Sequence, residues 1–162
     1  MALKFNTITA RTNGLYMQDE AIANAVIRPG MLLEERSDGK VDPHGVAGGN
    51  TMPKFAVEDD LQGKGIDDLY ASGARVIYRT FQRGDRVWAL LDHDQTVVVG
   101  DYVESAGNGL LQKHTPPVLD SGATMYANPI VGKVKQAVAT EDSSSDSTWD
   151  AYYGTRVLIE VV

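Results

Sequence analysis

The chain has 162 residues, a length that suits one folded domain, and 43% of its residues are hydrophobic and 23% charged, as in an ordinary soluble protein. It contains no cysteine, which excludes disulfide bonds, thiolate metal sites and a cysteine nucleophile. The 22 acidic residues outnumber the 15 Lys and Arg residues, and the net charge of −7 argues against binding to nucleic acid, because nucleic-acid binders displace counterions with a basic surface.

The sequence also predicts that the protein is made in a cytoplasm and is not inserted into a membrane. No continuous apolar run follows Lys4, so the N-terminus does not have the composition of a signal peptide. No stretch of the chain approaches the ~20 apolar residues that a membrane-spanning helix needs.

Residues 1–20 are polar and mixed, with an Asn-Gly turn signal at 13–14, and we expect them to form an extended N-terminal arm. An extended arm can add a strand to the edge of a neighbouring sheet. The apolar residues Leu3, Phe5 and Ile8 are therefore the candidate anchors of this arm on a partner.

Residues 21–162 are predicted to form a single β domain. The segment 19–28 allows a helix or a strand, and we favour a strand, because an apolar stretch at 31–35 and a hairpin-type turn at 37–40 follow at once. After a loop rich in Gly and Pro, further strands are predicted over residues 54–58, 75–81, 87–91, 96–99, 102–104, 110–113, 131–139 and 155–162. A helical turn at 66–70 is expected between the first two of these strands.

One short phrase recurs along the chain: a glycine, two further residues, then Val or Leu at the start of an apolar stretch. Its copies begin at Gly30, Gly73, Gly84 and Gly100. Glycine suits a corner between strands because it reaches positive φ without a steric penalty. In two copies the next residue is Asp85 or Asp101, and we interpret these side chains as turn-formers that bond the nearby backbone, not as catalytic groups.

Strands this short, with turns this frequent, predict an all-β fold, a compact barrel or sandwich. Residues 141–150 are rich in Ser and Asp and are expected to form a mobile loop near the C-terminus. Trp149, Tyr152 and Tyr153 close this loop, and such aromatic residues either form a contact patch for a partner or hold the loop against the domain.

Two groups of histidines invite a catalytic or metal-binding interpretation. Asp92-His93-Asp94 has suitable residue types, but successive residues of a strand point to opposite faces, so the triplet favours a polar hairpin tip. His44 and His114 are isolated beside prolines, without the converging ligands that a metal site needs, and we expect both to be exposed in loops.

The acidic pairs at 59–60 and 67–68 offer carboxylates for glycoside hydrolysis or for a hard cation, but their spacing does not match a calcium loop and a charged loop explains them. The Gly-rich segment 45–50 lacks the lysine of a phosphate-binding loop. No Gly-x-Ser-x-Gly elbow is present. We therefore predict no catalytic residue, no cofactor and no metal site, and a protein that is not an enzyme.

Several short motifs follow one another in a recognisable order. They are Pro29-Gly30-Met31-Leu32-Leu33-Glu34, Ala47-Gly48-Gly49-Asn50, Phe55-Ala56-Val57-Glu58-Asp59, Gln62-Gly63-Lys64-Gly65-Ile66-Asp67-Asp68, Gly84-Asp85-Arg86-Val87-Trp88-Ala89, Val99-Gly100-Asp101-Tyr102-Val103-Glu104, Gly107-Asn108-Gly109-Leu110-Leu111, Val131-Gly132-Lys133-Val134 and Arg156-Val157-Leu158-Ile159-Glu160-Val161. In this order, over roughly residues 22–162, they resemble the capsid cement, or head decoration, proteins of tailed bacteriophages.

The resemblance implies a small β-rich domain on the outer surface of the assembled virion, where it binds across boundaries between subunits of the major capsid protein and stabilises their contacts. It also implies a homo-oligomer, and a trimer is favoured over a dimer. Neither nucleic acid nor a membrane is expected as a partner.

Other functions fit parts of the sequence. The recurring Gly-Asp-x-Val phrase also resembles biotinyl and lipoyl carrier domains, which need an exposed lysine at a hairpin tip, and Lys113 lies beyond a strand instead. A host- or glycan-binding β module would use the patch of Trp149, Tyr152 and Tyr153. A small β-barrel hydrolase or metal enzyme is the remaining alternative, and the scattered histidines argue against it.

Overall fold

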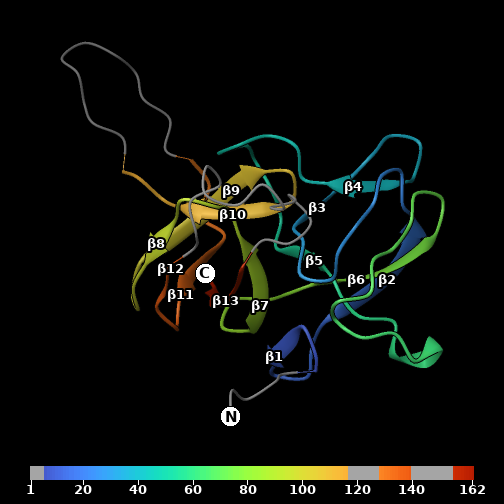
Figure 1. The fold of residues 1–162 in the computed structure, drawn as a ribbon, viewed down its shortest axis with the longest axis horizontal. Helices are drawn as coiled ribbons and strands as arrows, with labels where there is room; N and C mark the ends of the chain where they lie inside the picture. The colour runs from blue at the N-terminus through green and yellow to red at the C-terminus, as the bar shows by residue number, and fades with distance from the viewer. Residues whose placement is uncertain (1–5, 117–127, 140–154) are drawn as a thin grey trace.

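A computed structural model describes residues 6–116, 128–139 and 155–162, and within these ranges the fold is built almost wholly from strands (Figure 1). The predicted all-β class is therefore confirmed, as a sandwich-like arrangement of sheets and not as a regular closed barrel. The one helical element in the described part is a 3₁₀ turn, η1, at Asp60–Gln62.

The largest sheet has six strands in the order β1-β7-β10-β9-β11-β13. It curls back on itself, because β13 also pairs with β7, while a single residue pair, Leu111 with Leu91, joins β10 to β7. The strands are β1 (Thr9–Arg11), β7 (Arg86–Leu91), β9 (Tyr102–Gly107), β10 (Leu110–Lys113), β11 (Gly132–Val134) and β13 (Thr155–Val161).

A second sheet of three strands lies beside it, in the order β2-β6-β5, with β2 at an edge (Figure 1). Two small pairs complete the described fold: the hairpin of β3 with β4, and the pair β8 with β12. The strands are β2 (Met17–Ile22), β3 (Leu33–Glu35), β4 (Val41–Pro43), β5 (Lys54–Ala56), β6 (Arg75–Thr80), β8 (Thr96–Val97) and β12 (Val138–Ala139).

The buried apolar side chains form two clusters that share β7 as a wall. Because side chains alternate along a strand, Val87, Ala89 and Leu91 enter one cluster, which also contains Phe55 of β5 and Ile77 of β6, while Leu90 enters the other. The second cluster contains Val76 and residues of the β3–β4 hairpin. Each cluster contains residues of both sheets, so both clusters hold the two sheets together.

All four recurring glycines form turns of the same kind. Gly30, Gly73, Gly84 and Gly100 have φ between +84° and +102°, and in each case the next residue donates its N–H to the carbonyl three residues before it, at 2.9–3.1 Å. The residue before each glycine is not among the residues with positive φ, so these are type II turns, whose third position requires positive φ. The predicted glycine corners are confirmed.

The aspartates of two copies bond their own turns, as predicted. Asp85 accepts from the N–H of Gln82 at 2.9 Å, and Asp101 accepts from the N–H of Val98 at 3.0 Å. Asp85 is buried and also accepts from the N–H of Asn13 at 3.2 Å, which ties this corner to the N-terminal segment.

The structure differs from the sequence prediction in three segments. Within 6–20, β1 pairs with β7 and β2 with β6, so this part is built into the sheets and is not an extended arm. The long strand predicted over 131–139 is divided into β11 and β12 by a bend. The helical turn lies at η1, where Asp59 caps it, and not at 66–70.

Candidate functional site

The predicted contact residues are mostly outside the described part of the chain: Leu3, Phe5, Trp149, Tyr152, Tyr153 and the whole 141–150 segment lie outside it. Ile8 is described, and its side chain is 0% exposed in the core of its own chain. Its N–H donates to Glu58 Oε2 at 2.9 Å, and its carbonyl accepts from the N–H of Trp88 at 2.9 Å. Placed so, Ile8 fixes the N-terminal segment to the sheet and is not available as an anchor for a partner.

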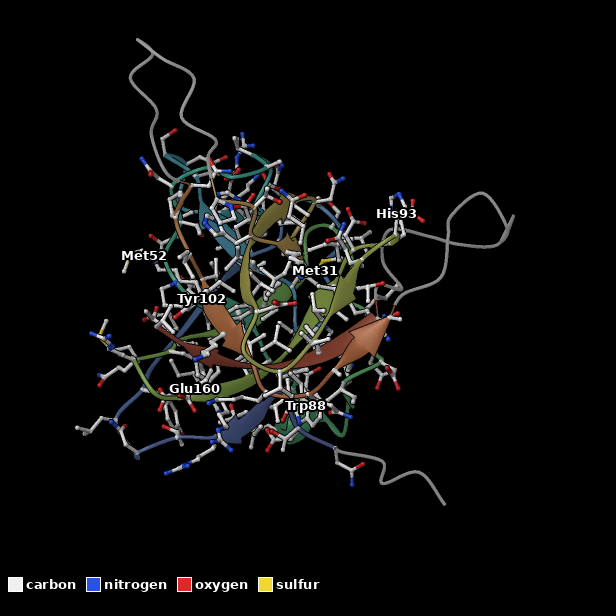
Figure 2. The ribbon with its side chains drawn as sticks, turned by 90° about the vertical axis from the view of Figure 1, so that its left-hand side faces the viewer. Met31, Met52, Trp88, His93, Tyr102 and Glu160 are labelled. Carbon is white, nitrogen blue, oxygen red and sulfur yellow. The ribbon has the colours of Figure 1, made fainter. Side chains whose placement is uncertain are left out.

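The triplet Asp92-His93-Asp94 lies in a turn between β7 and β8, where Asp94 has a φ of 55°. His93 lies at the periphery of the molecule (Figure 2) and its Nδ1 lies 2.8 Å from Asp92 Oδ1. The predicted polar turn is confirmed, but it is not the tip of a hairpin, because β7 pairs with β1, β10 and β13 while β8 pairs with β12. Within the described ranges, no group of three or more His, Cys, Asp or Glu side chains is placed to hold a metal ion.

The prediction that His44 and His114 are exposed is wrong. His44 is buried, with its Nδ1 2.7 Å from Ser105 Oγ and its Nε2 3.2 Å from the carbonyl oxygen of Asn50. The side chain of His114 is 9% exposed, with its Nδ1 2.6 Å from Glu104 Oε2. Both histidines lie in loops, as their prolines indicate, but strand β9 supplies a buried hydrogen-bond partner to each.

Glu104 is the centre of a buried polar cluster, and its side chain is 4% exposed. Besides the contact with His114, its Oε1 accepts from Gln112 Nε2 at 2.8 Å and from Asn128 Nδ2 at 3.0 Å. Burial of a carboxylate is costly unless hydrogen bonds compensate it, and three partners do so here. The cluster therefore joins β9, β10 and the segment before β11, a structural role that needs no substrate.

Ser105 and His44 have the residue types of a nucleophile and its base, so their access to solvent decides what they can do. Ser105 is 1% exposed, and its Oγ also accepts from the N–H of Gly107 at 3.2 Å. A hydroxyl enclosed in this way cannot meet a substrate carbonyl. The pair instead holds the loop after β4 against β9.

The acidic pairs have local roles. Asp59 accepts from the N–H of Gln62 and caps η1, and Asp68 accepts from the N–H of Gly65 at 2.6 Å. Asp67 Oδ1 lies 2.9 Å from Arg28 Nη2. These contacts agree with the predicted charged loop.

Arg156, on β13, is a buried cation that the sequence pattern did not single out. Its Nη1 donates to the carbonyl of Pro29 at 2.9 Å and its Nη2 to the carbonyl of Ile66 at 2.5 Å. Burial, together with the nearby charge of Arg28, lowers the pKa of Arg156 to about 10. The Arg156 side chain joins two loops to the curled sheet. Its partners, Pro29 and Ile66, are far from it in the sequence, so this role can be recognised only from the structure.

Two further sequence motifs have structural explanations. Gly48 lies against the Asn128 side chain, with no room for a Cβ, and its N–H donates to the Ser105 carbonyl at 2.8 Å, so the Gly-rich segment packs on β9. Lys113 ends β10 and pairs with Asp101 at 2.8 Å, away from any hairpin tip, unlike the lysine of a carrier domain.

Exposed apolar side chains, which suit a binding protein, gather at one sheet edge and are otherwise scattered. The described residues contain no helix long and apolar enough to cross a membrane. Exposed large apolar side chains gather before and along β2, where Leu15 is 67% and Met17 64% exposed. Tyr16 and Ile22 are exposed there too, and the remaining exposed ones are spread over Val46, Met52, Leu61, Leu69, Val98, Val99, Tyr102, Ile130 and Val162.

Comparison with known proteins shows a likeness at the level of the fold. No protein-family model matches the sequence, and no curated protein matches it. Among solved structures, the chain is similar to the N base of head fiber gp8.5 of bacteriophage phi29, with a TM-score of 0.51 and 10% sequence identity. The alignment covers 91% of this chain and 95% of that chain, so the two share an architecture over nearly their whole lengths.

Proposed function

We propose that this protein is a structural component of a phage virion that binds the outer surface of the assembled capsid and stabilises contacts between major capsid protein subunits. The observation that carries the proposal is the likeness in fold to a phage head-fibre base, which extends over 91% of the chain. A fold alone does not define a function. The order of sequence motifs independently resembles phage head decoration proteins, and two independent pointers to the phage head support the proposal.

The chemistry of the described residues supports the same proposal. The side chains with the residue types of catalytic groups, the Ser105–His44 pair and Glu104, are buried and hydrogen-bonded within the chain. The net charge of −7 favours docking on a locally basic surface. A protein that acts by binding to a surface needs a complementary surface of its own and no reactive side chain.

The mechanism is mass action. A protein that binds the assembled shell and not its free subunits lowers the free energy of the shell, by about 2.7 kcal/mol per site when its free concentration is 100 times Kd. Assembly of the protein into an oligomer, for which we propose a trimer before a dimer, would engage several capsid subunits at once and multiply weak contacts.

The test is sedimentation of purified protein with empty shells of the phage that carries the gene, together with the melting temperature of those shells. We expect saturable binding at a fixed number of copies per shell and a melting temperature that rises with occupancy. Protein that stays in the supernatant at all concentrations, or binds without changing the melting temperature, would contradict capsid binding or capsid stabilisation respectively.

A further inference from the structure

The edge of β2 that faces away from β6 is not paired with another strand among the described residues. β2 pairs with β6 along its whole length, from Met17 with Thr80 to Ile22 with Arg75, and lies at the end of its sheet. Five of its six residues are exposed. Edge strands with unpaired backbone groups are the usual sites at which another extended chain adds to a sheet.

The register shows which backbone groups are available. On β6, Ile77 accepts from the N–H of Val57 and therefore faces β5, so Val76, Tyr78 and Thr80 face β2. Their opposite residues on β2 are Ala21, Asp19 and Met17, which leaves Gln18 and Glu20 with N–H and C=O directed outward. Among the described residues, no hydrogen bond is made to these outward groups.

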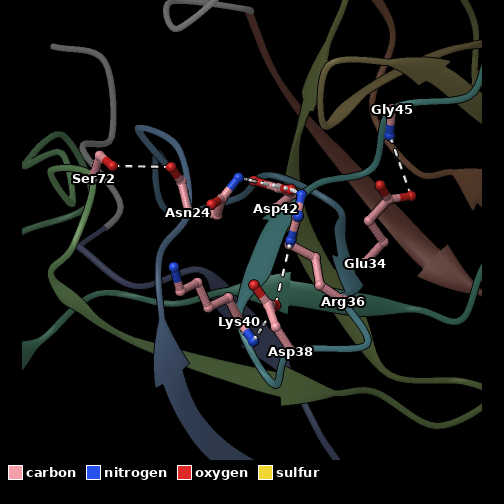
Figure 3. Close-up of polar contacts among 8 residues, drawn as sticks. All are labelled: Asn24, Glu34, Arg36, Asp38, Lys40, Asp42, Gly45 and Ser72. Carbon is pink, nitrogen blue, oxygen red and sulfur yellow. Dashed lines mark hydrogen bonds and ion pairs between the residues drawn. The ribbon is translucent and has the colours of Figure 1, made fainter.

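The far end of the edge is closed by the β3–β4 hairpin. Just beyond β2, the N–H of Asn24 donates to the carbonyl of Val41 at 2.9 Å, and Asn24 Nδ2 donates to Asp42 at 3.1 Å (Figure 3). Arg36 Nη1 holds the same Asp42 at 3.0 Å, and Ser72 Oγ donates to the Asn24 carbonyl at 2.9 Å (Figure 3). An added strand would thus be stopped at Ile22 and set in one register.

The side chains along the edge favour a basic partner. A shallow hollow of about 230 Å³ lies beside the edge, lined by Glu20, Ala21, Ile22 and Arg75. A long cationic side chain fits this lining, because its aliphatic part can lie on Ile22 while its charged end meets Glu20, whose carboxylate also pairs with Arg75 at 2.8 Å. Asp19 adds a second carboxylate, which takes part in no ion pair among the described residues.

A second copy of this chain is a poor occupant of the edge. Antiparallel pairing of two β2 strands about a two-fold axis through Asp19 or Glu20 places that carboxylate opposite its own copy, and like charges directly opposite each other destabilise a strand pair. Each copy also carries a net charge of −7. The charge pattern therefore selects a basic segment of another protein.

We propose that the edge of β2 receives an extended segment of the capsid surface with a Lys or Arg between apolar residues, which adds antiparallel or parallel to β2 and contacts Glu20. The inference rests on the proposed capsid binding and names the surface responsible for it. Exposed Met17 and Ile22 flank the acidic centre and would contact the apolar residues of the added segment.

A proline at an outward position tests the edge without touching the pairing with β6. Proline has no N–H and its ring obstructs an added strand, and an edge strand accepts it where the N–H faces solvent. Glu20→Pro is compared with Glu20→Ala, which loses the same ion pair with Arg75 but keeps the N–H. Gln18→Pro with Gln18→Ala is the second pair, and unfolding curves establish that each variant is folded.

We expect Glu20→Pro to bind shells roughly tenfold or more weakly than Glu20→Ala, because it loses a backbone hydrogen bond and adds a steric block. Asp19→Lys should also weaken binding, most strongly at low salt. In hydrogen exchange on the unaltered protein, the amides of Gln18 and Glu20 should become protected when shells are added.

The outcomes separate the two proposals. Equal binding by the proline and alanine variants, with no protection at Gln18 and Glu20, overturns the edge proposal while capsid binding stands. Absence of shell binding by the unaltered protein refutes the proposed function and with it this partner. Dimerisation without shells that Glu20→Pro abolishes would assign the edge to a second copy, and undiminished binding by Asp19→Lys would exclude a basic partner.

Discussion

Gly30 and Gly84 occupy the same type of turn, and substituting each by alanine separates backbone strain from steric conflict. Their φ values are +97° and +91°, so the backbone strain of a side chain is nearly equal at the two positions. A Cβ at Gly84 meets nothing within 4 Å. A Cβ at Gly30 lies 2.6 Å from Arg156 Nη1 and 2.9 Å from the carbonyl oxygen of Trp88.

The magnitudes follow from these contacts. Positive φ costs an L-residue about 1–2 kcal/mol, and alanine regains roughly 0.4–1 kcal/mol by restricting the unfolded chain, so Gly84→Ala should cost about 1 kcal/mol. At Gly30 the Arg156 guanidinium must also move, which weakens its hydrogen bonds to the carbonyls of Pro29 and Ile66. A hydrogen bond to a charged group is worth about 1.5–3 kcal/mol, so Gly30→Ala should cost about 4 kcal/mol.

Chemical denaturation of the two variants and the unaltered protein measures both free energies of unfolding. The denaturant m-values should be unchanged, since both substitutions act on the folded state. A difference between Gly30→Ala and Gly84→Ala of less than about 1 kcal/mol would refute the assigned role of Arg156 as the group that fills the space over Gly30.

Three further predictions concern buried polar groups. Glu104→Ala should lower the free energy of unfolding by about 3 kcal/mol, because it leaves Gln112, Asn128 and His114 without their shared acceptor; an effect below about 1 kcal/mol would mean that these groups find water instead. Asp85→Ala should cost about 2 kcal/mol and the exposed Asp94→Ala less than about 0.5 kcal/mol, since only Asp85 accepts from two backbone N–H groups; equal costs would refute the capping role. Burial raises the pKa of Tyr70 from 10.0 to about 12, so its contribution to stability is complete below pH 10 and is lost as the pH rises toward 12. Tyr70→Phe should therefore make the free energy of unfolding less dependent on pH between 10 and 12. At pH 7 it should cost about 1 kcal/mol, because the hydrogen bond to the Val57 carbonyl is lost. An unchanged pH dependence between 10 and 12 would contradict the raised pKa of Tyr70.

The sequence was most informative where the signal is local. A type II turn needs positive φ at one position, so glycine followed by an apolar stretch identified the corners at Gly30 and Gly84 without knowledge of the rest of the fold. The hairpin through Asn108 followed in the same way, since both Asn108 and Gly109 have positive φ, as a two-residue hairpin turn requires.

The errors concern contacts between residues far apart in the chain. His44 is buried beside Ser105, which lies 61 residues later and within hydrogen-bond distance of its Nδ1, and no local pattern near His44 indicates this. β2 is exposed on both faces, so it lacks the alternation of apolar and polar residues by which a strand is recognised, and the segment resembled an arm. For the same reason the candidate edge at Glu20 became visible only when the register with β6 was known.

The central claim is that the protein lies on the outside of a phage capsid, and electron cryo-microscopy of virions from the phage that carries the gene tests it most directly. We expect density of the size of this domain on the outer surface, bridging major capsid subunits, with the edge of β2 against a capsid segment. Virions that lack the protein, or that hold it inside the shell, would contradict the account.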